Sequence, residues 1–411
     1  METTEPVPAR ERSAEVGPVS GSNRAEILDV LRGFALFGIL LTHVPSFSGY
    51  DYLPPDRAVA LDAYGIDRFT VGIVDLLVDG KFVALFSLLF GVGFAIQMRH
   101  LDSNDERTRR RFLRRTSFLL AIGLAHTFLL WQGDILTYYA LLGFVLLLFR
   151  SKPPRKLILY AMLSLTLAGA GYGAVYGVYN LAPDVLPLGE AGASAYMQRI
   201  VDITGTFASG SYAEVLAANF SFWLVKVQWI LFDGRLFTIF GLFLLGAALG
   251  KLEVHYRLRE YQRAIWIALG VCGIVGFAGS ALVVYLRARQ DLYPPTAMGI
   301  FETLLAGFAR PSLGIAYAAA LCLLASTAFG RVADACFAAP GRMALTTYLS
   351  QTVLCIALFY GFGVGLSHSM GHVESLLTAV LLFMGQSLVC RWWLARFRYG
   401  PVEWVWRQFT Y

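Results

Sequence analysis

The chain has 411 residues, of which 57% are hydrophobic and only 15% charged, and its formal net charge is +6. Soluble domains have about a quarter charged residues, so this composition excludes an ordinary soluble protein. Apolar runs of about 20 residues recur from Leu28 to Arg391, and each can cross a hydrocarbon core of about 30 Å. The sequence predicts an all-α fold: a polytopic transmembrane helical bundle.

Residues 1–25 differ in composition from the rest of the chain. They are rich in Glu, Arg, Pro and Ser, which predicts a disordered tail. The basic, apolar and small-residue regions of a signal peptide are absent, so we expect the first apolar segment to be retained as a helix. Residues 26–411 are then a single transmembrane helical domain.

The first apolar helix carries Asp29, Arg32 and His43. Arg32 and His43 are close to three helical turns apart, about 16 Å along the axis, so they point the same way. Ionisable residues within a membrane helix are expensive, which favours a functional site. Alternatively, Asp29 and Arg32 simply pair at the membrane boundary, and His43 is a satisfied core histidine.

The placement of positively charged loops on the cytoplasmic side predicts a topology with about ten spans. The stretch from Arg99 to Arg115 contains seven arginines, which indicate a cytoplasmic loop rather than a nucleic-acid site, because no aromatic residues alternate with them. Both termini are then cytoplasmic, in a multi-pass protein of the cytoplasmic (inner) membrane. The predicted spans lie near 28–47, 76–97, 112–130, 135–149, 157–179, 236–250, 264–286, 303–325, 343–363 and 374–391.

Two further segments bear on this topology. Residues 213–232 are apolar but contain Asn219, Lys226 and Gln228, and a helix along the outer interface keeps the later basic loops inside. A span there would flip them. The Gly/Ser/Pro-punctuated connection 181–212 is predicted to be a long, partly ordered outer loop.

The topology places most polar candidates near the outer end of the bundle. His43 and the turn from Trp131 to Asp134 fall there, as do Asp233 and Arg235. His368 and His372 are interpreted as solvated loop histidines. The five cysteines lack the spacing of a metal site or a disulfide framework.

Five motifs in order resemble the YeiB-like family (domain of unknown function 418) of bacterial inner-membrane proteins. The resemblance covers nearly the whole chain after the tail, with acyltransferase-like motifs in 26–180 and YeiB-like ones in 211–411. The motifs are Leu-Asp29-Val-Leu-Arg32-Gly-Phe-Ala, Lys81-Phe-Val-Ala-Leu-Phe, Gly-Leu-Ala-His126 with Trp131-Gln-Gly-Asp134, Gly341-Arg-Met-Ala-Leu-Thr-Thr-Tyr, and Gly400-Pro-Val-Glu-Trp.

That family looks related to a superfamily of transmembrane acyltransferases, which includes acyltransferase family 3 and the heparan-glucosaminide acetyltransferases. In family 3, an Arg-x10-His pattern on the first helix is tied to acyl transfer. Arg32 and His43 meet this pattern. The resemblance implies acyl transfer by analogy with a superfamily.

Acyl transfer needs a base for the acceptor proton, and imidazole suits this at neutral pH. His43 and His126 are the candidates, acting directly or through an acyl-imidazole. Asp134 can orient either ring, and the three are predicted to converge on one cavity. Arg32, with Asp29, can hold a phosphate of an acyl-CoA co-substrate. Alternatively, His126 hydrogen-bonds a neighbouring helix as a structural residue.

Three functions remain open from the sequence. The first is an enzyme that moves an acyl group, with acetyl as the expected one, from cytoplasmic acyl-CoA to an envelope glycan or lipid at the outer face. The second is a transporter of a small molecule or lipid, because buried ionisable residues also mark transport paths. The third is a structural or signalling membrane protein without turnover. No bound cofactor and no nucleic acid is expected.

Overall fold

The computed structural model describes residues 26–53, 59, 64–99, 106–181, 190–289 and 295–410. The tail predicted over residues 1–25 lies outside these residues. Throughout the described ranges the regular structure is helical, with no strand. The all-α prediction is confirmed.

The helices follow one another with short connections. Three short elements accompany them: η2 (Tyr50–Tyr52), the π-helical turn η3 (His126–Leu130) and η4 (Leu147–Phe149). The α-helices are α1 (Glu26–Phe47), α3 (Tyr64–Leu77), α4 (Lys81–Arg99), α5 (Glu106–Ala125), α6 (Leu136–Leu146), α7 (Pro154–Leu181), α8 (Glu190–Ser209), α9 (Tyr212–Phe232), α10 (Arg235–Lys251), α11 (Gln262–Arg289), α12 (Ala297–Leu324), α13 (Ala328–Arg342), α14 (Ala344–Phe359), α15 (His372–Leu394) and α16 (Pro401–Thr410).

The polytopic class is confirmed, but ten spans was an imprecise count. Within the described residues, six helices are long and apolar enough to cross a membrane. The number becomes seven if α13 and α14, which meet at an 85° bend, form one broken span. Three predicted spans fall outside this set: 76–97 corresponds to the 19-residue helix α4, 135–149 to the shorter apolar stretch Leu136–Phe149, and 236–250 to the 17-residue helix α10. The chain is therefore a multi-pass membrane protein in a lipid bilayer.

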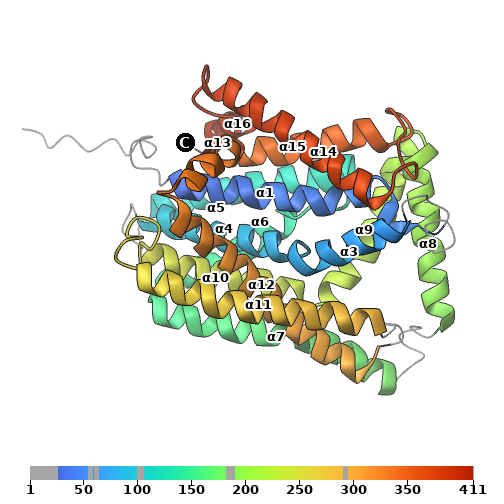
Figure 1. Cartoon of the computed structure of the whole chain (residues 1–411), viewed down its shortest axis with the longest axis horizontal. Coiled ribbons are helices and arrows are strands. Elements are labelled where there is room, and N and C mark those ends of the chain that lie inside the picture. Colours follow the sequence, from blue (N-terminus) through green and yellow to red (C-terminus); the bar gives the residue numbers. More distant parts are fainter. Residues whose placement is uncertain are drawn as a thin grey trace, which may run out of the picture.

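Most long helices run alongside one another in Figure 1. The carboxyl-terminal helices α14, α15 and α16 lie along the upper edge, and α7 and α11 along the lower edge, with α1 and α4 between them. The most extensive helix contacts join α11 with α12, α4 with α10, α1 with α13, and α7 with α10. Segments far apart in the sequence thus share the interior of one bundle.

Glycine allows the close approach of α4 and α10. A Cβ atom at Gly91 would collide with the carbonyl oxygen of Phe243 on α10. At Gly93, two residues along α4, the nearest neighbour would be an Arg32 nitrogen at 3.8 Å, an ordinary contact. Membrane helices use small residues in this way to bring their backbones together.

The predicted loop over 181–212 is wrong over residues 190–209, which form helix α8. Ile200, Ile203 and Phe207 recur at helical spacing and are buried in the main apolar core. The Phe207 ring stacks on that of Tyr360, with centroids 5.2 Å apart. In Figure 1, α8 runs crosswise to the long helices at one end of the bundle. Apolar burial on this face outweighs the Gly and Ser residues that suggested a loop.

Helix α9 occupies the segment whose membrane placement was ambiguous. It is continuous from Tyr212 to Phe232 and is not among the six span candidates in the described residues. The interfacial interpretation of 213–232 stays a prediction.

Candidate functional site

The main feature of the interior is a partly enclosed cavity of about 890 Å³. Its wall combines side chains from α1, the turn before α4, the turn before α6, and helices α9 to α12. A volume of this size is in the range of small-molecule sites. Among the charged and titratable residues of the wall are His43, Asp134, Lys226 and Arg235.

His43, on α1, lines this cavity and is partly exposed. Its ring meets that of Trp131 edge to face, with centroids 4.6 Å apart, and lies 6.4 Å from the ring of Tyr348. Within the described part of the chain, neither ring nitrogen has a hydrogen-bond partner, and neither is fully enclosed. His43 therefore has a nitrogen available to a ligand.

His126 and Asp134 lie together, as the sequence predicted. His126 Nδ1 is 3.1 Å from Asp134 Oδ1, an ion-pair distance without the alignment of a hydrogen bond. Asp134 Oδ2 accepts a hydrogen bond from the backbone N–H of Thr137 at 2.7 Å. Asp134 therefore also holds the first turn of α6, as a capping carboxylate does.

The π-helical turn places His126 and shapes the loop that follows it. The N–H of Trp131 bonds to the carbonyl of His126 at 2.8 Å, and the backbone at Trp131 is extended. The chain then turns through Gln132 and Gly133 to Asp134. Such π turns inside α-helices occur frequently at functional sites.

His126 itself does not line the cavity. Only 1% of its surface is exposed, and its Nε2 lies 2.9 Å from the Thr352 hydroxyl on α14. Tyr348 lies between the two histidines, with its ring 5.2 Å from that of His126. His43, His126 and Asp134 thus gather in one region, but only His43 and Asp134 reach the cavity. Among the described residues, Asp134 pairs with His126 and not with His43.

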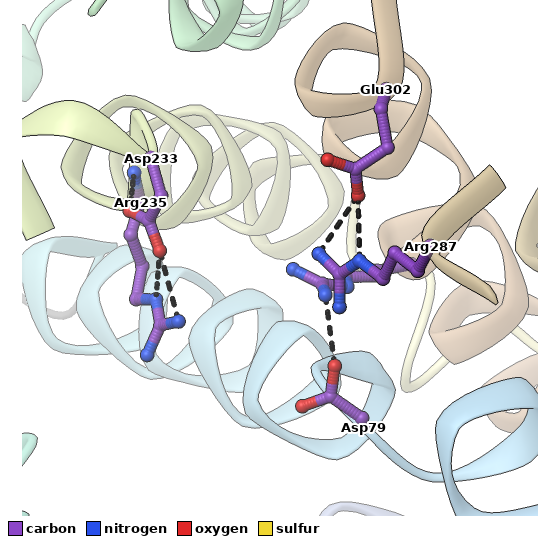
Figure 2. A network of polar contacts seen from close by, with 6 residues as sticks. Asp79, Asp233, Arg235, Arg287 and Glu302 are labelled. Atoms are coloured by element: carbon purple, nitrogen blue, oxygen red, sulfur yellow. Dashed lines mark hydrogen bonds and ion pairs between the residues drawn. The ribbon is translucent and has the colours of Figure 1, made fainter. Parts of the chain in front are cut away.

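Three ion pairs also line the cavity, and Figure 2 shows their side chains. Asp233 and Arg235 pair at 2.9 Å beside α10, and Arg287 of α11 pairs with Glu302 of α12 at 2.8 Å. Arg310 of α12 reaches Asp79, in the turn before α4, at 2.8 Å. The predicted candidates Asp233 and Arg235 are therefore on the cavity wall. Half of the Arg235 side chain is exposed, although it lies deep in the bundle, because it borders the cavity.

Asp29 and Arg32 lie away from this cavity. Arg32 Nη1 is 2.9 Å from Asp29 Oδ1 on the same helix. Neither residue contributes to the cavity wall. The structure thus shows the pair that was the alternative to donor binding, and it does not bring Arg32 and His43 to one cavity.

Sequence reasoning missed several residues of the wall. His372, interpreted as a solvated loop histidine, is only 2% exposed, and its Nδ1 lies 2.8 Å from the Thr70 hydroxyl. It is the first residue of α15 and is buried within the protein, so the solvated interpretation is wrong. Glu302 and Arg310 carried a usable signal, because both are ionisable residues within the apolar helix α12.

Asp51 lies at the cavity in η2, just after α1. Burial raises the pKa of Asp51 from 3.8 to about 6, against a hydrogen bond from Ser46 that lowers it. Part of its surface is accessible, but that surface borders the cavity. Across the described residues, no group of three His, Cys, Asp or Glu side chains has the arrangement of a metal site.

The chain is similar to several bacterial proteins over nearly its whole length. Residues 249–411 match the family described as "Protein of unknown function (DUF418)". "Uncharacterized protein YxaH" of Bacillus subtilis is 30% identical over 96% of both chains. "Uncharacterized protein YeiB" of Escherichia coli is 29% identical over 93% of this chain and 95% of its own length.

Proposed function

The chain belongs to the DUF418 (YeiB-like) family, and we propose that it is an integral-membrane acyltransferase. It moves an acyl group, with acetyl as our choice, from cytoplasmic acyl-CoA to an envelope glycan or lipid at the outer face. One observation carries the proposal: the His43 imidazole faces a cavity of about 890 Å³ with no hydrogen-bond partner among the described residues.

The proposed acyl transfer requires one neutral imidazole to accept a proton and then donate it. A nitrogen of His43 removes the proton from an acceptor hydroxyl or amine as its oxygen or nitrogen attacks the thioester carbonyl. The bond between the carbonyl carbon and sulfur then breaks. The departing thiolate takes the proton back from His43, so the products are the acylated acceptor and free CoA. The protein is unchanged after the cycle and needs no bound cofactor.

His126 and Asp134 support this step as positioning residues. Their contact, and the Asp134 bond to Thr137, hold both ends of the turn that carries Trp131. Trp131 is 5% exposed and packs against His43 and Phe47. A fixed Trp131 ring limits the orientations of the His43 ring, which is what a base aligned with one acceptor atom requires.

Donor binding by Arg32 is a separate part of the proposal. Because Arg32 lies off the cavity, it can hold only a distant phosphate of acyl-CoA, with the thioester arm reaching toward His43 between helices. We expect Arg32→Ala to raise the apparent KM for acetyl-CoA more than it lowers kcat. If Arg32→Ala and Asp29→Ala lower kcat equally and neither raises the KM for acetyl-CoA, Arg32 does not bind the donor. Its role is then only to pair with Asp29.

The proposal places the protein in the cytoplasmic membrane with both termini in the cytoplasm. The basic connection between α10 and α11 supports this orientation, because Arg257 and Arg259 lie within it. A cysteine introduced at one of the positions 255–260, in a chain without its five native cysteines, should be labelled only after permeabilisation. Labelling in intact cells would contradict this orientation.

The decisive experiment is acyl transfer from radiolabelled acetyl-CoA to envelope extract. Loss of a general base typically lowers the rate by about 10²–10⁴-fold, so His43→Gln should lose nearly all incorporation. His368→Asn is the matched control, because it changes another histidine that does not line the cavity. Wild-type incorporation by His43→Gln at equal protein level would refute the catalytic assignment.

Transport is the second candidate, and the charged wall of the cavity favours it. The Arg287–Glu302 pair joins α11 to α12, and the Arg310–Asp79 pair joins α12 to the turn before α4. Charges inside membrane proteins often mark a substrate or proton path. If purified wild-type protein transfers no acyl group to any envelope acceptor, uptake of envelope precursors into proteoliposomes becomes the assay to perform.

A further inference from the structure

Lys226, on α9, enters the cavity near the candidate base. Its Nζ lies 5.7 Å from the centre of the Trp131 ring and 3.4 Å from the carbonyl oxygen of Gln132. The same indole contacts His43 from its edge, with centroids 4.6 Å apart. One small molecule bound against Trp131 can therefore touch both Lys226 and His43.

The other strong cations of the wall already have carboxylate partners. Arg235 pairs with Asp233, Arg287 with Glu302, and Arg310 with Asp79, each at 2.8–2.9 Å. Within the described residues, Lys226 is the one lysine or arginine of this wall without an ion pair.

The nearby carboxylate of Asp134 does not fill this role. Its Oδ1 lies beside His126 Nδ1 and its Oδ2 accepts the Thr137 N–H. The partners of Lys226 are thus a neutral carbonyl and an aromatic face. Taking an ammonium out of bulk water without a counter-ion is costly, and an anion from a ligand would offset that cost.

We propose that Lys226 binds the negatively charged group of the acyl acceptor, a carboxylate or a phosphate. This inference rests on the proposed function for the identity of the ligand as an acceptor. The anionic group lies against the Lys226 ammonium, and the acceptor's hydroxyl or amine then lies toward His43. The acceptor class is therefore an anionic envelope molecule, and neutral sugars and neutral lipids are excluded.

The first test measures anion binding without any acyl transfer. Purified protein in detergent is melted with inorganic phosphate or acetate, against potassium chloride at equal ionic strength. We expect one of the two anions to raise the melting temperature by roughly 2 °C or more. Lys226→Met should lose this rise, and Lys226→Arg, which keeps the charge, should retain it.

A matched variant separates ligand binding from a structural role. Without added anion, Lys226→Met should melt at or above the wild-type temperature, because it removes a charge with no counter-ion. Arg310→Met should melt lower, because it leaves Asp79 without its partner. A wild-type protein that responds to neither anion, or a Lys226→Met protein that keeps the response, would overturn the proposal.

The second test reads the charge of the product. Radiolabelled acetyl product from envelope extract should bind an anion-exchange resin at neutral pH, and a neutral or cationic product would overturn the acceptor class. If the wild type forms no product, the proposed function fails. In that case the melting experiment still decides whether Lys226 binds an anion.

Discussion

His43 and Trp131 meet edge to face with ring centroids 4.6 Å apart, although they come from different ends of the amino-terminal half. His43 is on α1, whereas Trp131 follows the π-helical turn at the end of α5. The position of the candidate base therefore depends on the turn that presents the indole. The contacts that hold this turn are the first ones to test.

Removing the carboxylate of Asp134 should loosen this turn. Asp134→Ala deletes both the contact with His126 and the bond from the Thr137 N–H. Loss of a capping side chain costs about 0.5–2 kcal/mol, so a lower melting temperature is expected. At a temperature where the variant is still folded, the rate of acyl transfer from radiolabelled acetyl-CoA should also be lower than that of the wild type.

Asp134→Asn is the informative companion to that variant. Its amide oxygen can still accept from Thr137, but it lacks the charge that faces His126. We expect near wild-type stability with reduced activity. Activity equal to the wild type would show that the carboxylate only caps α6.

Breaking the Arg310–Asp79 pair should destabilise the protein. The side chains are 24% and 40% exposed, so the cost lies between those of surface and buried pairs, about 1–3 kcal/mol for Arg310→Met. Adding Asp79→Asn to that variant should restore part of the lost stability, because the carboxylate no longer lacks a partner. Thermal unfolding in detergent measures both. Additive losses in the double variant would argue against a direct interaction.

Gly91 and Gly93 provide a matched pair on one helix. Gly91→Ala places a methyl group against the Phe243 backbone, and overpacking of this kind costs about 1–3 kcal/mol. Gly93→Ala meets nothing closer than 3.8 Å and should be tolerated. The purified yield and the melting temperature in detergent are measured for both variants and compared with those of the wild type. Equal tolerance at both positions would contradict the close packing of α4 on α10.

Asp51 should make stability depend on pH. Its pKa is raised to about 6 in the folded protein from an ordinary value of 3.8, so the folded state binds more protons between these values. Stability therefore falls as pH rises from about 4 to about 6, and the penalty stays constant above that window. Asp51→Asn should melt with less dependence on pH across it. An unchanged pH profile in that variant would exclude Asp51 as the source.

Local patterns in the sequence predicted contacts between residues that are near in the chain. His126 and Asp134 flank a single turn, so their proximity followed from spacing. The hydrophobic runs likewise predicted a helical membrane bundle.

Tertiary packing determined what the sequence did not predict. Lys226 appeared only as a polar residue in an ambiguous helix, since nothing local indicates that α9 faces Trp131. The separation of Arg32 from the cavity was equally invisible, because a shared helix face does not specify which neighbours cover it. Helix α8 was missed because its Gly and Ser residues hid the apolar spacing of Ile200, Ile203 and Phe207.

The π-helical turn over His126–Leu130 adds a residue to the end of α5, and this has a consequence for insertions and deletions. Each residue of an α-helix advances the chain by about 100° around the axis. Deleting one residue of this turn would restore regular α-helical winding and rotate everything beyond it, swinging the indole of Trp131 away from α1. The number of residues in this turn is therefore more constrained than their identity. A chain with a shorter turn would need different side chains to line its cavity.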